Sequence, residues 1–305
     1  MKIFNNLNIS KKYKRSSLAF GNFDGVHKGH QKVLKYAKKF SKKNKSKFGI
    51  LTFSPLPVMF FNKKIKNYRL TSENDKFRLL KKHGVDFVIN IKFNKNFSNI
   101  SADSFIKKII HQKINPKQIF VSTNFKFGNK RRGNVNLLKK FERKYDYKLL
   151  KINPYKYKKK LISSSRNRKC LQKGSIDKAN KLLSRTWSII GQVIKGKQLG
   201  RKLGYRTCNI RIKNYILPMV GIYAVNVSIG NRKNLSRGVA YLGSRPTFKG
   251  KEIFLEINIF DIKKNLYKKK LGVYFLKFIR RDIKFNSSAE LIRQMNNDVI
   301  LAKKV

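Results

Sequence analysis

The chain of 305 residues is 41% hydrophobic, enough for packed cores, and its length favours about two domains. No apolar run approaches the roughly 20 residues of a membrane span, and residues 1–16 lack the apolar stretch of a signal peptide. The two cysteines form no motif, which fits a reducing compartment. The sequence therefore indicates a cytoplasmic protein without a membrane partner. The net charge of +60 could indicate nucleic-acid binding, but the lysines are spread along the whole chain, which favours a solvated lysine surface and no specific nucleic-acid partner.

A strand, a glycine-rich turn and a helix are predicted near the start of the chain. The apolar run Leu18–Phe20 is typical of a buried strand end, and residues 31–40 place apolar side chains at helical spacing. His27 and His30 therefore lie close together on one face at the helix N-terminus. Unpaired backbone N–H groups and the positive end of the helix dipole suit a phosphate there, and the glycines of this turn allow a close approach.

The stretch Gly21–His30 resembles the signature of the nucleotidyltransferase half of bacterial bifunctional riboflavin kinase/FAD synthetases. In the reaction that this resemblance implies, the FMN phosphate attacks the α-phosphorus of ATP, and His27 and His30 donate hydrogen bonds to the phosphate oxygens. Asp24 either orients the loop or contacts the ligand, and a turn-forming aspartate before Gly25 is a nearly equal alternative. The nucleotide-binding residues implied here are Gly21, Phe23, Asp24, Gly25 and Gly29.

Strands and helices alternate along the rest of the first half, which predicts a doubly wound, mostly parallel, Rossmann-like α/β sheet. After the strand at 48–53, Leu56 stands where the resembled family usually has a histidine, which removes a polar contact to the nucleotide. Strands are predicted at 48–53, 85–91 and 119–122, and helices at 70–83, capped by Thr71 or Ser72, and at 101–110.

Two further segments of the first half resemble nucleotide-binding parts of the same family. The aromatic and basic loop at 124–134 resembles a segment that helps to form the nucleotide and flavin pocket, and a packed turn is its alternative interpretation. Residues 162–168 resemble a stretch whose hydroxyl and guanidinium groups face the ATP phosphates, with Asn167 at an apolar position of that stretch. A capped helix over 168–183 is compatible with this role. The residues implied are Asn124, Phe127, Gly128, Ser164, Ser165 and Arg166.

The pattern changes near Arg185, where we place the boundary between a first domain, 1–184, and a second domain, 185–305. Short strands with frequent turns follow, which is typical of a small antiparallel β-barrel. Residues 287–299 form an amphipathic helix capped by Ser287 or Ser288. The strands are predicted at 187–194, 222–229, 237–242, 253–260 and 271–279.

The second half resembles the riboflavin kinase domain of the same family. The segments that carry the resemblance follow in order and include the glycine-rich run Gly191–Gly204, the stretch Gly238–Phe248 and the stretch Leu255–Ile257. A glycine-rich loop lets backbone amides wrap phosphates without side-chain clashes. The residues implied to hold ATP are Gly196, Gly200, Arg201 and Gly204.

Three oxygen-bearing side chains of this half are implied to carry the phosphoryl transfer. The resemblance assigns Mg²⁺ to Thr207 and Asn209, whose hard oxygens suit this ion. It assigns Glu256 as the general base for the ribityl 5′-hydroxyl of riboflavin. The alternative for Glu256 is a solvent-facing strand residue, which the scarcity of acids in the chain disfavours. Arg206 stands where the family has a proline, which loosens the backbone before Thr207.

Together the two resemblances imply a cytoplasmic bifunctional enzyme that phosphorylates riboflavin to FMN and adenylylates FMN to FAD, with ATP as co-substrate and Mg²⁺ as cofactor. One alternative is a riboflavin kinase with an eroded adenylyltransferase half, because Leu56 and Asn167 depart from the family pattern. Another is a basic nucleic-acid-binding protein, which would require clustered aromatic side chains on which bases stack.

Overall fold

The computed structural model describes the chain except residues 197–203, 231–233, 248–249 and 263. It forms two compact units, which we call unit 1 and unit 2. Unit 1 comprises Met1–Lys66 and Glu73–Ser163, and unit 2 comprises Asn67–Ser72 and Ser164–Val305. Among the described residues, no helix combines the length and the apolar character that a bilayer crossing requires.

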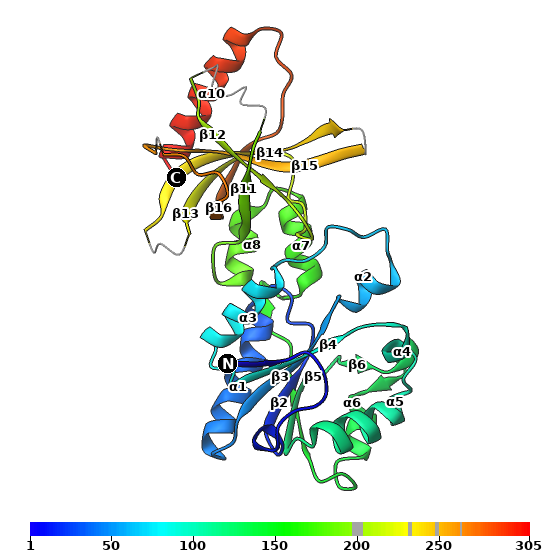
Figure 1. The fold of residues 1–305 in the computed structure, drawn as a ribbon. Coiled ribbons are helices and arrows are strands. Elements are labelled where there is room, and N and C mark those ends of the chain that lie inside the picture. The colour runs from blue at the N-terminus through cyan, green and yellow to red at the C-terminus, as the bar shows by residue number, and fades with distance from the viewer. Residues whose placement is uncertain (197–203, 231–233, 248–249, 263) are drawn as a thin grey trace. The chain divides into compact units, whose positions relative to one another are not determined.

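Unit 1 is built on a six-stranded, fully parallel sheet in the order β1-β4-β3-β2-β5-β8 (Figure 1). This confirms the predicted Rossmann-like, doubly wound sheet. The outer strands β1 and β8 are additions that the sequence patterns do not predict. The strands are β1 (Lys2–Phe4), β2 (Ser17–Phe20), β3 (Phe48–Ser54), β4 (Phe87–Lys92), β5 (Gln118–Ser122) and β8 (Lys148–Ile152).

Helices cover both faces of this sheet (Figure 1). On one face α1 (Lys28–Lys43) and α3 (Glu73–Lys82) pack through residues such as Leu34 and Leu80. On the other face the π-helical segment η2 (Phe105–Ile114) and α6 (Val135–Lys140) bury their apolar sides. The remaining elements are η1 (Lys11–Tyr13), α2 (Pro57–Phe61), α4 (Lys95–Ser98), α5 (Ala102–Ser104), β6 (Lys126–Phe127), η3 (Asn129–Arg131), β7 (Gly133–Asn134), β9 (Lys156–Tyr157) and β10 (Lys160–Leu161).

The helix α3 begins three residues later than the sequence predicts. A start at Leu70 is wrong because Asn67–Ser72 lies in unit 2, where the backbone groups of the segment have partners outside a helix. The indole Nε1 of Trp187 donates to the Leu70 carbonyl oxygen at 2.8 Å, and the Arg69 N–H donates to Asn214 O at 2.9 Å.

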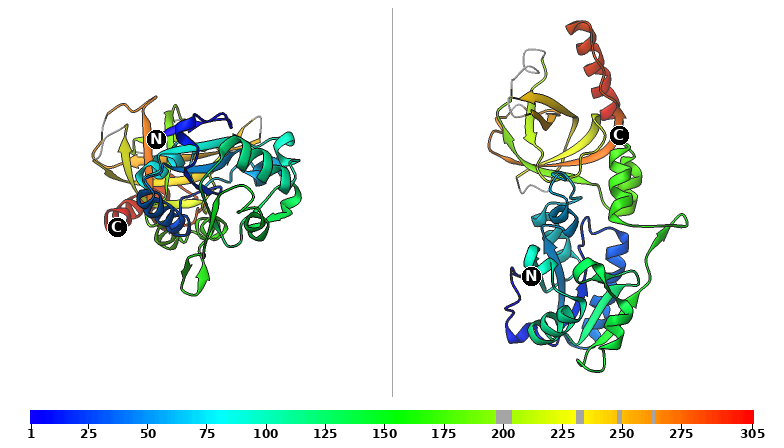
Figure 2. Two further views of the ribbon diagram at one scale, coloured as in Figure 1. Left: turned by 90° about the horizontal axis from the view of Figure 1, so that it is seen from below. Right: turned by 90° about the vertical axis from the view of Figure 1, so that its right-hand side faces the viewer.

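Unit 2 is a closed barrel of six antiparallel strands in the order β11-β12-β15-β14-β13-β16. Its core includes the fully buried rings of Trp187, Tyr223 and Phe275. Figure 2 shows α10 (Ser288–Lys303) against the outside of the barrel, with Ser287 as its N-cap as predicted. The strands are β11 (Ser188–Ile194), β12 (Thr207–Arg211), β13 (Gly221–Ile229), β14 (Ser236–Thr247), β15 (Gly250–Ile259) and β16 (Lys270–Arg280).

Two short helices, α7 (Ser164–Gln172) and α8 (Ile176–Leu183), replace the single helix predicted at 168–183. The chain turns between them at Gly174, whose φ of +70° lies in the left-handed region that glycine tolerates. Both helices pack with the compact unit 2. The functional boundary between residues 184 and 185 stays a prediction, because compact packing does not report which residues serve which reaction.

Candidate active sites

The loop after β2 lies at the point where the strand order of the unit 1 sheet reverses. From β2 the chain passes through α1 to β3 on one side and later reaches β5 on the other side. Ligands of open α/β sheets bind outside the carboxyl ends of the strands at such a point. The loops after β2 and β5, which carry two of the predicted nucleotide-binding segments, therefore flank the expected ligand position.

His27 and His30 lie close together at the N-terminus of α1, as predicted, and their rings stack. His27 is the N-cap, and its Nδ1 accepts the backbone N–H of His30 at 3.3 Å. The two rings stack with centroids 3.7 Å apart and planes 16° from parallel. Because Nδ1 is the acceptor, the proton of neutral His27 resides on Nε2. A Cβ at Gly29 would lie 3.1 Å from the His27 ring and 3.3 Å from Ile162 O, so glycine permits this packing.

The rest of the histidine loop is a tightly held turn. Phe23 and Val26, at φ of 48° and 39°, are non-glycine residues in the left-handed region, as is Gly25 at 83°. Phe23 is 1% exposed, and its ring lies 5.1 Å from that of His30, so it anchors the loop in the core. Asp24 is 3% exposed, and a carboxylate so deeply buried requires partners within the protein, which is compatible both with orienting the loop and with forming the turn before Gly25.

The loop after β5 presents Asn124 at the surface, buries Phe127 and packs Gly128 closely against its neighbours. Asn124 is exposed, and its Oδ1 accepts the Ser122 hydroxyl at 2.7 Å. Phe127 is 7% exposed and packs 5.2 Å from the Phe105 ring. Gly128, at φ of +73°, has no room for a side chain, because a Cβ would lie 2.8 Å from the Ala102 backbone. Phe127 and Gly128 therefore shape this loop by packing.

Ser164, Ser165 and Arg166 form the first residues of α7 and belong to unit 2, whereas the histidine pair belongs to unit 1. Asn167 is fully buried, in the position where an apolar side chain was expected. Arg168 donates from Nε to Tyr68 O at 2.8 Å, and its guanidinium stacks 3.6 Å above the Tyr68 ring. Leu56, in place of the family's histidine, is 2% exposed before α2.

In unit 2, the register of β12 against β15 brings Thr207, Asn209 and Glu256 together. Asn209 lies directly opposite Glu256, and Thr207 is two residues earlier on the same strand face. The Thr207 hydroxyl donates to Glu256 Oε1 at 2.6 Å. The predicted metal-binding and general-base residues therefore share one face of the barrel wall, opposite the side on which Leu255 and Ile257 are fully buried.

Asn209 is 6% exposed, and within the described part of the chain its Oδ1 has no hydrogen-bond partner. A Cβ at Gly196 would lie 2.3 Å from Asn209 Nδ2, so Gly196 makes room for this amide. Leaving a buried carbonyl oxygen unpaired costs roughly 1–3 kcal/mol, and such an oxygen suits a hard cation such as Mg²⁺. In the described residues, no group of three or more His, Cys, Asp or Glu side chains could hold a metal ion.

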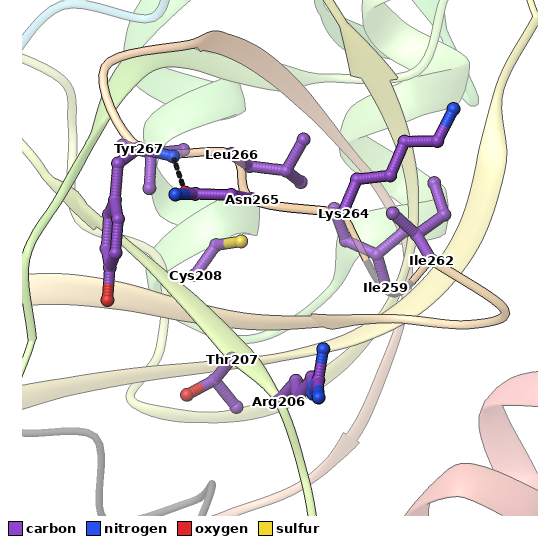
Figure 3. A pocket seen from close by; sticks show the side chains of 10 residues that line it. Arg206, Thr207, Cys208, Ile259, Ile262, Lys264, Asn265, Leu266 and Tyr267 are labelled. Atoms are coloured by element: carbon purple, nitrogen blue, oxygen red, sulfur yellow. Dashed lines mark hydrogen bonds between the residues drawn. The ribbon is translucent and has the colours of Figure 1, made fainter.

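A cavity of about 230 Å³ lies beside Thr207, at one end of the barrel (Figure 3). Its wall includes Cys208, whose thiol pKa is raised by burial, so the thiol is protonated at neutral pH. The backbone before Thr207 is held by Asn258, whose Nδ2 donates to Arg206 O at 2.8 Å. The cavity is lined by Val193, Arg206, Thr207, Cys208, Ile259, Ile262, Lys264, Asn265, Leu266 and Tyr267.

Among the cavity residues, Lys264 and Asn265 are not predicted as site residues from the sequence. Asn265 Oδ1 accepts the Tyr267 N–H at 3.0 Å (Figure 3), and an Asn followed two residues later by its hydrogen-bonded N–H is a turn signal that the sequence offers. Of the glycine-rich loop, Gly200 and Arg201 lie outside the described residues. Gly204 is exposed, with a φ of +82°.

Two family models match the chain in succession. The model described as FAD synthetase matches residues 9–166, and the model described as riboflavin kinase matches residues 183–305. These matches coincide with the two halves in which the two sets of candidate residues lie.

Three curated relatives carry the name bifunctional riboflavin kinase/FMN adenylyltransferase. The protein of Buchnera aphidicola (subsp. Schizaphis graminum) is 40% identical and covers 97% of this chain and 96% of its own length. That of Haemophilus influenzae is 34% identical, with coverage of 97% and 96%. That of Escherichia coli K12 is 32% identical, with coverage of 94% and 91%.

One solved structure is similar over almost the whole chain. It is titled as a macrolide-efflux protein from Streptococcus pneumoniae and is 28% identical, with a TM-score of 0.85 and coverage of 97% of this chain and 96% of that chain. The likeness shows that the succession of a parallel-sheet unit and a barrel unit is shared with a crystal structure. The activity in that title is a statement about the other protein.

Proposed function

The chain belongs to the family of bifunctional riboflavin kinase/FMN adenylyltransferases, and on that premise we propose which residues carry each of its two reactions. The protein phosphorylates riboflavin to FMN with ATP and adenylylates FMN to FAD with release of pyrophosphate. An eroded adenylyltransferase half is not favoured, because the FAD synthetase model matches residues 9–166. Leu56 and Asn167 are buried side chains whose positions are compatible with an intact fold.

We propose that Glu256 is the general base of the kinase reaction. The ribityl 5′-hydroxyl oxygen of riboflavin bonds to the γ-phosphorus of ATP, the bond from that phosphorus to the β,γ-bridging oxygen breaks, and ADP leaves. Glu256 accepts the hydroxyl proton. The Thr207 hydroxyl, at 2.6 Å from Oε1, orients the carboxylate on the face of the barrel wall that also carries Asn209. This clustering is the observation on which the assignment rests.

Thr207 and Asn209 would hold Mg²⁺ beside Glu256. The fit is supported by the buried, unpartnered Oδ1 of Asn209 and by the hydroxyl oxygen of Thr207 on the same strand face. Bound there, Mg²⁺ would supply neutralisation of charge on the phosphates of ATP. The neighbouring cavity suits the nucleotide, since Arg206 and Lys264 offer cations and Tyr267 offers an aromatic face. Gly196, Gly200, Arg201 and Gly204 remain proposed contacts of its phosphates.

For adenylyl transfer, we propose that His27 and His30 stabilise the reacting phosphates. An FMN phosphate oxygen bonds to the α-phosphorus of ATP, and the bond from this phosphorus to the leaving pyrophosphate breaks. The nucleophile is already an anion, so the site must stabilise charge more than remove a proton. The stacked imidazoles at the N-terminus of α1 meet that need.

For adenylyl transfer, the family resemblance proposes nucleotide contacts from three segments of the chain. The loop after β2 contributes Gly21, Phe23, Asp24, Gly25 and Gly29, of which Phe23 acts through packing. The loop after β5 contributes Asn124, with Phe127 and Gly128 shaping it. The start of α7 contributes Ser164, Ser165 and Arg166.

The wider assignments are proposals on the same footing. We place the functional boundary between residues 184 and 185, the protein in the cytoplasm, and its partners among riboflavin, FMN and ATP, with no specific nucleic acid and no membrane. The even spread of lysines supports the last point. Nucleic-acid binding that persists at physiological salt would contradict it.

The function is tested by chromatography of reactions started from riboflavin, ATP and Mg²⁺, and separately from FMN. FAD from both starting substrates is the expected result. FMN alone from riboflavin, with no turnover of FMN, would contradict an active adenylyltransferase half. FAD formed from FMN, with no turnover of riboflavin, would contradict the kinase assignment.

A further inference from the structure

A buried lysine lies beneath the histidine loop of unit 1. Lys76 of α3 is only 2% exposed, whereas Lys81 and Lys82 on the same helix are exposed. Removing an ammonium from water is costly unless it makes compensating polar contacts. An apolar side chain at this position would avoid that cost, so the polar contacts of the Lys76 ammonium indicate why a lysine stands there.

The ammonium ends on a chain of hydrogen bonds that leads to the loop. Lys76 Nζ donates to Thr52 Oγ1 at 3.2 Å, and Thr52 Oγ1 donates to the Asn22 carbonyl oxygen at 3.1 Å. Thr52 is fully buried on β3. A hydroxyl that accepts from a cation becomes a better donor. The lysine therefore both orients the Thr52 hydroxyl and strengthens its hold on the loop.

The position of Asn22 affects where the histidine pair lies. The backbone before it is fixed on the neighbouring strand, because Gly21 N donates to Leu51 O at 3.1 Å. The next residue, Phe23, turns through a left-handed φ of 48° and packs its ring 5.1 Å from that of His30. A shift of the Asn22 carbonyl would therefore move Phe23 and, with it, the imidazole packed against Phe23.

The other charged group on the same face of α3 has a separate task. Glu73 accepts hydrogen bonds from the Ser54 hydroxyl at 2.5 Å and from Asn90 Nδ2 at 2.8 Å, so it links the end of β3 to the middle of β4. Glu73 and Lys76 are three residues apart and lie on one helical face. The helix α3 thus provides the Glu73 carboxylate as an acceptor for β3 and β4, and the Lys76 ammonium as a donor on the side of the loop after β2.

We propose that Lys76, acting through Thr52, is a positioning residue for adenylyl transfer. It fixes the carbonyl of Asn22 and thereby the placement of His27 and His30, without contacting a substrate itself. The inference rests on the proposed assignment of adenylyl transfer to the histidine loop. The signature of that loop, Gly21–His30, includes neither Lys76 nor Thr52.

The test compares Thr52→Val, Thr52→Ser and Lys76→Met in the full chain, with Lys81→Met as the matched control on the same helix. The readouts are kcat and KM for FMN adenylylation, kcat/KM for riboflavin phosphorylation, and thermal unfolding. Thr52→Val and Lys76→Met should lower adenylylation kcat by about tenfold, the effect of losing one charge-assisted hydrogen bond. Kinase kcat/KM should stay unchanged. Thr52→Ser, which keeps the hydroxyl, and Lys81→Met should both stay close to the unchanged protein.

The double variant Lys76→Met/Thr52→Val separates positioning from general stability. Because both residues act through one chain of bonds, the double variant should lose no more adenylylation than the worse single variant. Multiplicative losses, or a Thr52→Val protein with unchanged kcat, would overturn the inference. So would equal losses in Thr52→Ser and Thr52→Val. His30→Ala tests the assignment of adenylyl transfer to the histidine loop separately from the role of Lys76. If this variant leaves FAD synthesis intact, the assignment itself fails, and not only the proposed hydrogen-bond chain.

Discussion

In unit 1 the proposed catalytic groups come from one continuous stretch, with His27 capping the helix that carries His30. In unit 2 they come from two strands, and the hydrogen bond from Thr207 to Glu256 joins residues 49 positions apart. A helix N-terminus aligns neighbouring residues by itself, but the loop before it needs anchoring from other elements, such as Thr52 on β3. Paired strands need no such anchor, because the register alone places Asn209 opposite Glu256.

This difference predicts that each reaction can be removed without the other. Glu256→Gln keeps the shape of the side chain and removes its ability to accept a proton. We expect riboflavin phosphorylation to fall by a factor of about 10² to 10⁴, with adenylylation of supplied FMN unchanged, as measured by initial rates of each step. Asp261→Asn, at an exposed acid just after β15, is the control and should change neither rate. Equal losses in both reactions by a folded Glu256→Gln protein would refute the division.

His30→Ala should give the reverse pattern. Loss of the outer imidazole of the stack removes a donor to the reacting phosphates, and we expect adenylylation kcat to fall by about 10² to 10³. His30 is not the N-cap, so the helix keeps its acceptor at His27 Nδ1. Steady-state rates from FMN and from riboflavin measure the two effects. An unchanged FAD rate would show that the stacked pair has no part in the chemistry.

Asn209→Leu tests whether the two reactions depend on Mg²⁺ through different residues. A side chain of similar size without the oxygen should raise the Mg²⁺ concentration needed for half-maximal kinase activity by roughly tenfold to a hundredfold. Adenylylation, served by the other unit, should keep its Mg²⁺ dependence. Titration of Mg²⁺ at saturating ATP measures both. If the kinase curve does not move, Asn209 is not a ligand.

The smallest expected effect concerns stability and should leave both reactions alone. Burial raises the pKa of Glu142, but hydrogen bonds from Lys139 and from the Leu149 N–H outweigh this, so the pKa is lowered from 4.5. A lowered pKa means that the carboxylate stabilises the fold above the pKa of the unfolded chain and that this contribution is lost as the pH falls through the folded pKa.

Glu142→Gln should therefore reduce stability at pH 7 by about 1 kcal/mol or less. The gap between variant and unchanged protein should close as the pH is lowered below 4.5. Thermal unfolding at a series of pH values measures the gap. A gap that widens in acid would reverse the sign of this argument. Since Glu142 lies outside both candidate sites, the ratio of the two activities should not change.

The sequence predicts those parts of the fold and the sites that depend on neighbouring residues, and it misses parts that depend on residues far apart in the chain. The histidine pair and its helix are predicted because the stretch is local, and Glu256 stands out because the chain has only 14 acidic residues. The strand β12 is missed, because its outward face carries Thr207 and Asn209 instead of an alternating apolar pattern. The start of α3 is missed because Leu70 belongs to unit 2. Lys76 has no distinguishing signal among 74 lysines and arginines, since only burial sets it apart.

The most direct test mixes the two single variants, Glu256→Gln and His30→Ala, with riboflavin, ATP and Mg²⁺ and follows FMN and FAD by chromatography. Alone, the first should leave riboflavin unconverted and the second should stop at FMN. Together they should form FAD, because FMN released by one protein is adenylylated by the other. Failure of the mixture, with each variant folded and active in its remaining step, would contradict two separate sites that exchange FMN through solution. FAD formed by either variant alone as fast as by the unchanged protein would contradict the residues assigned to that site.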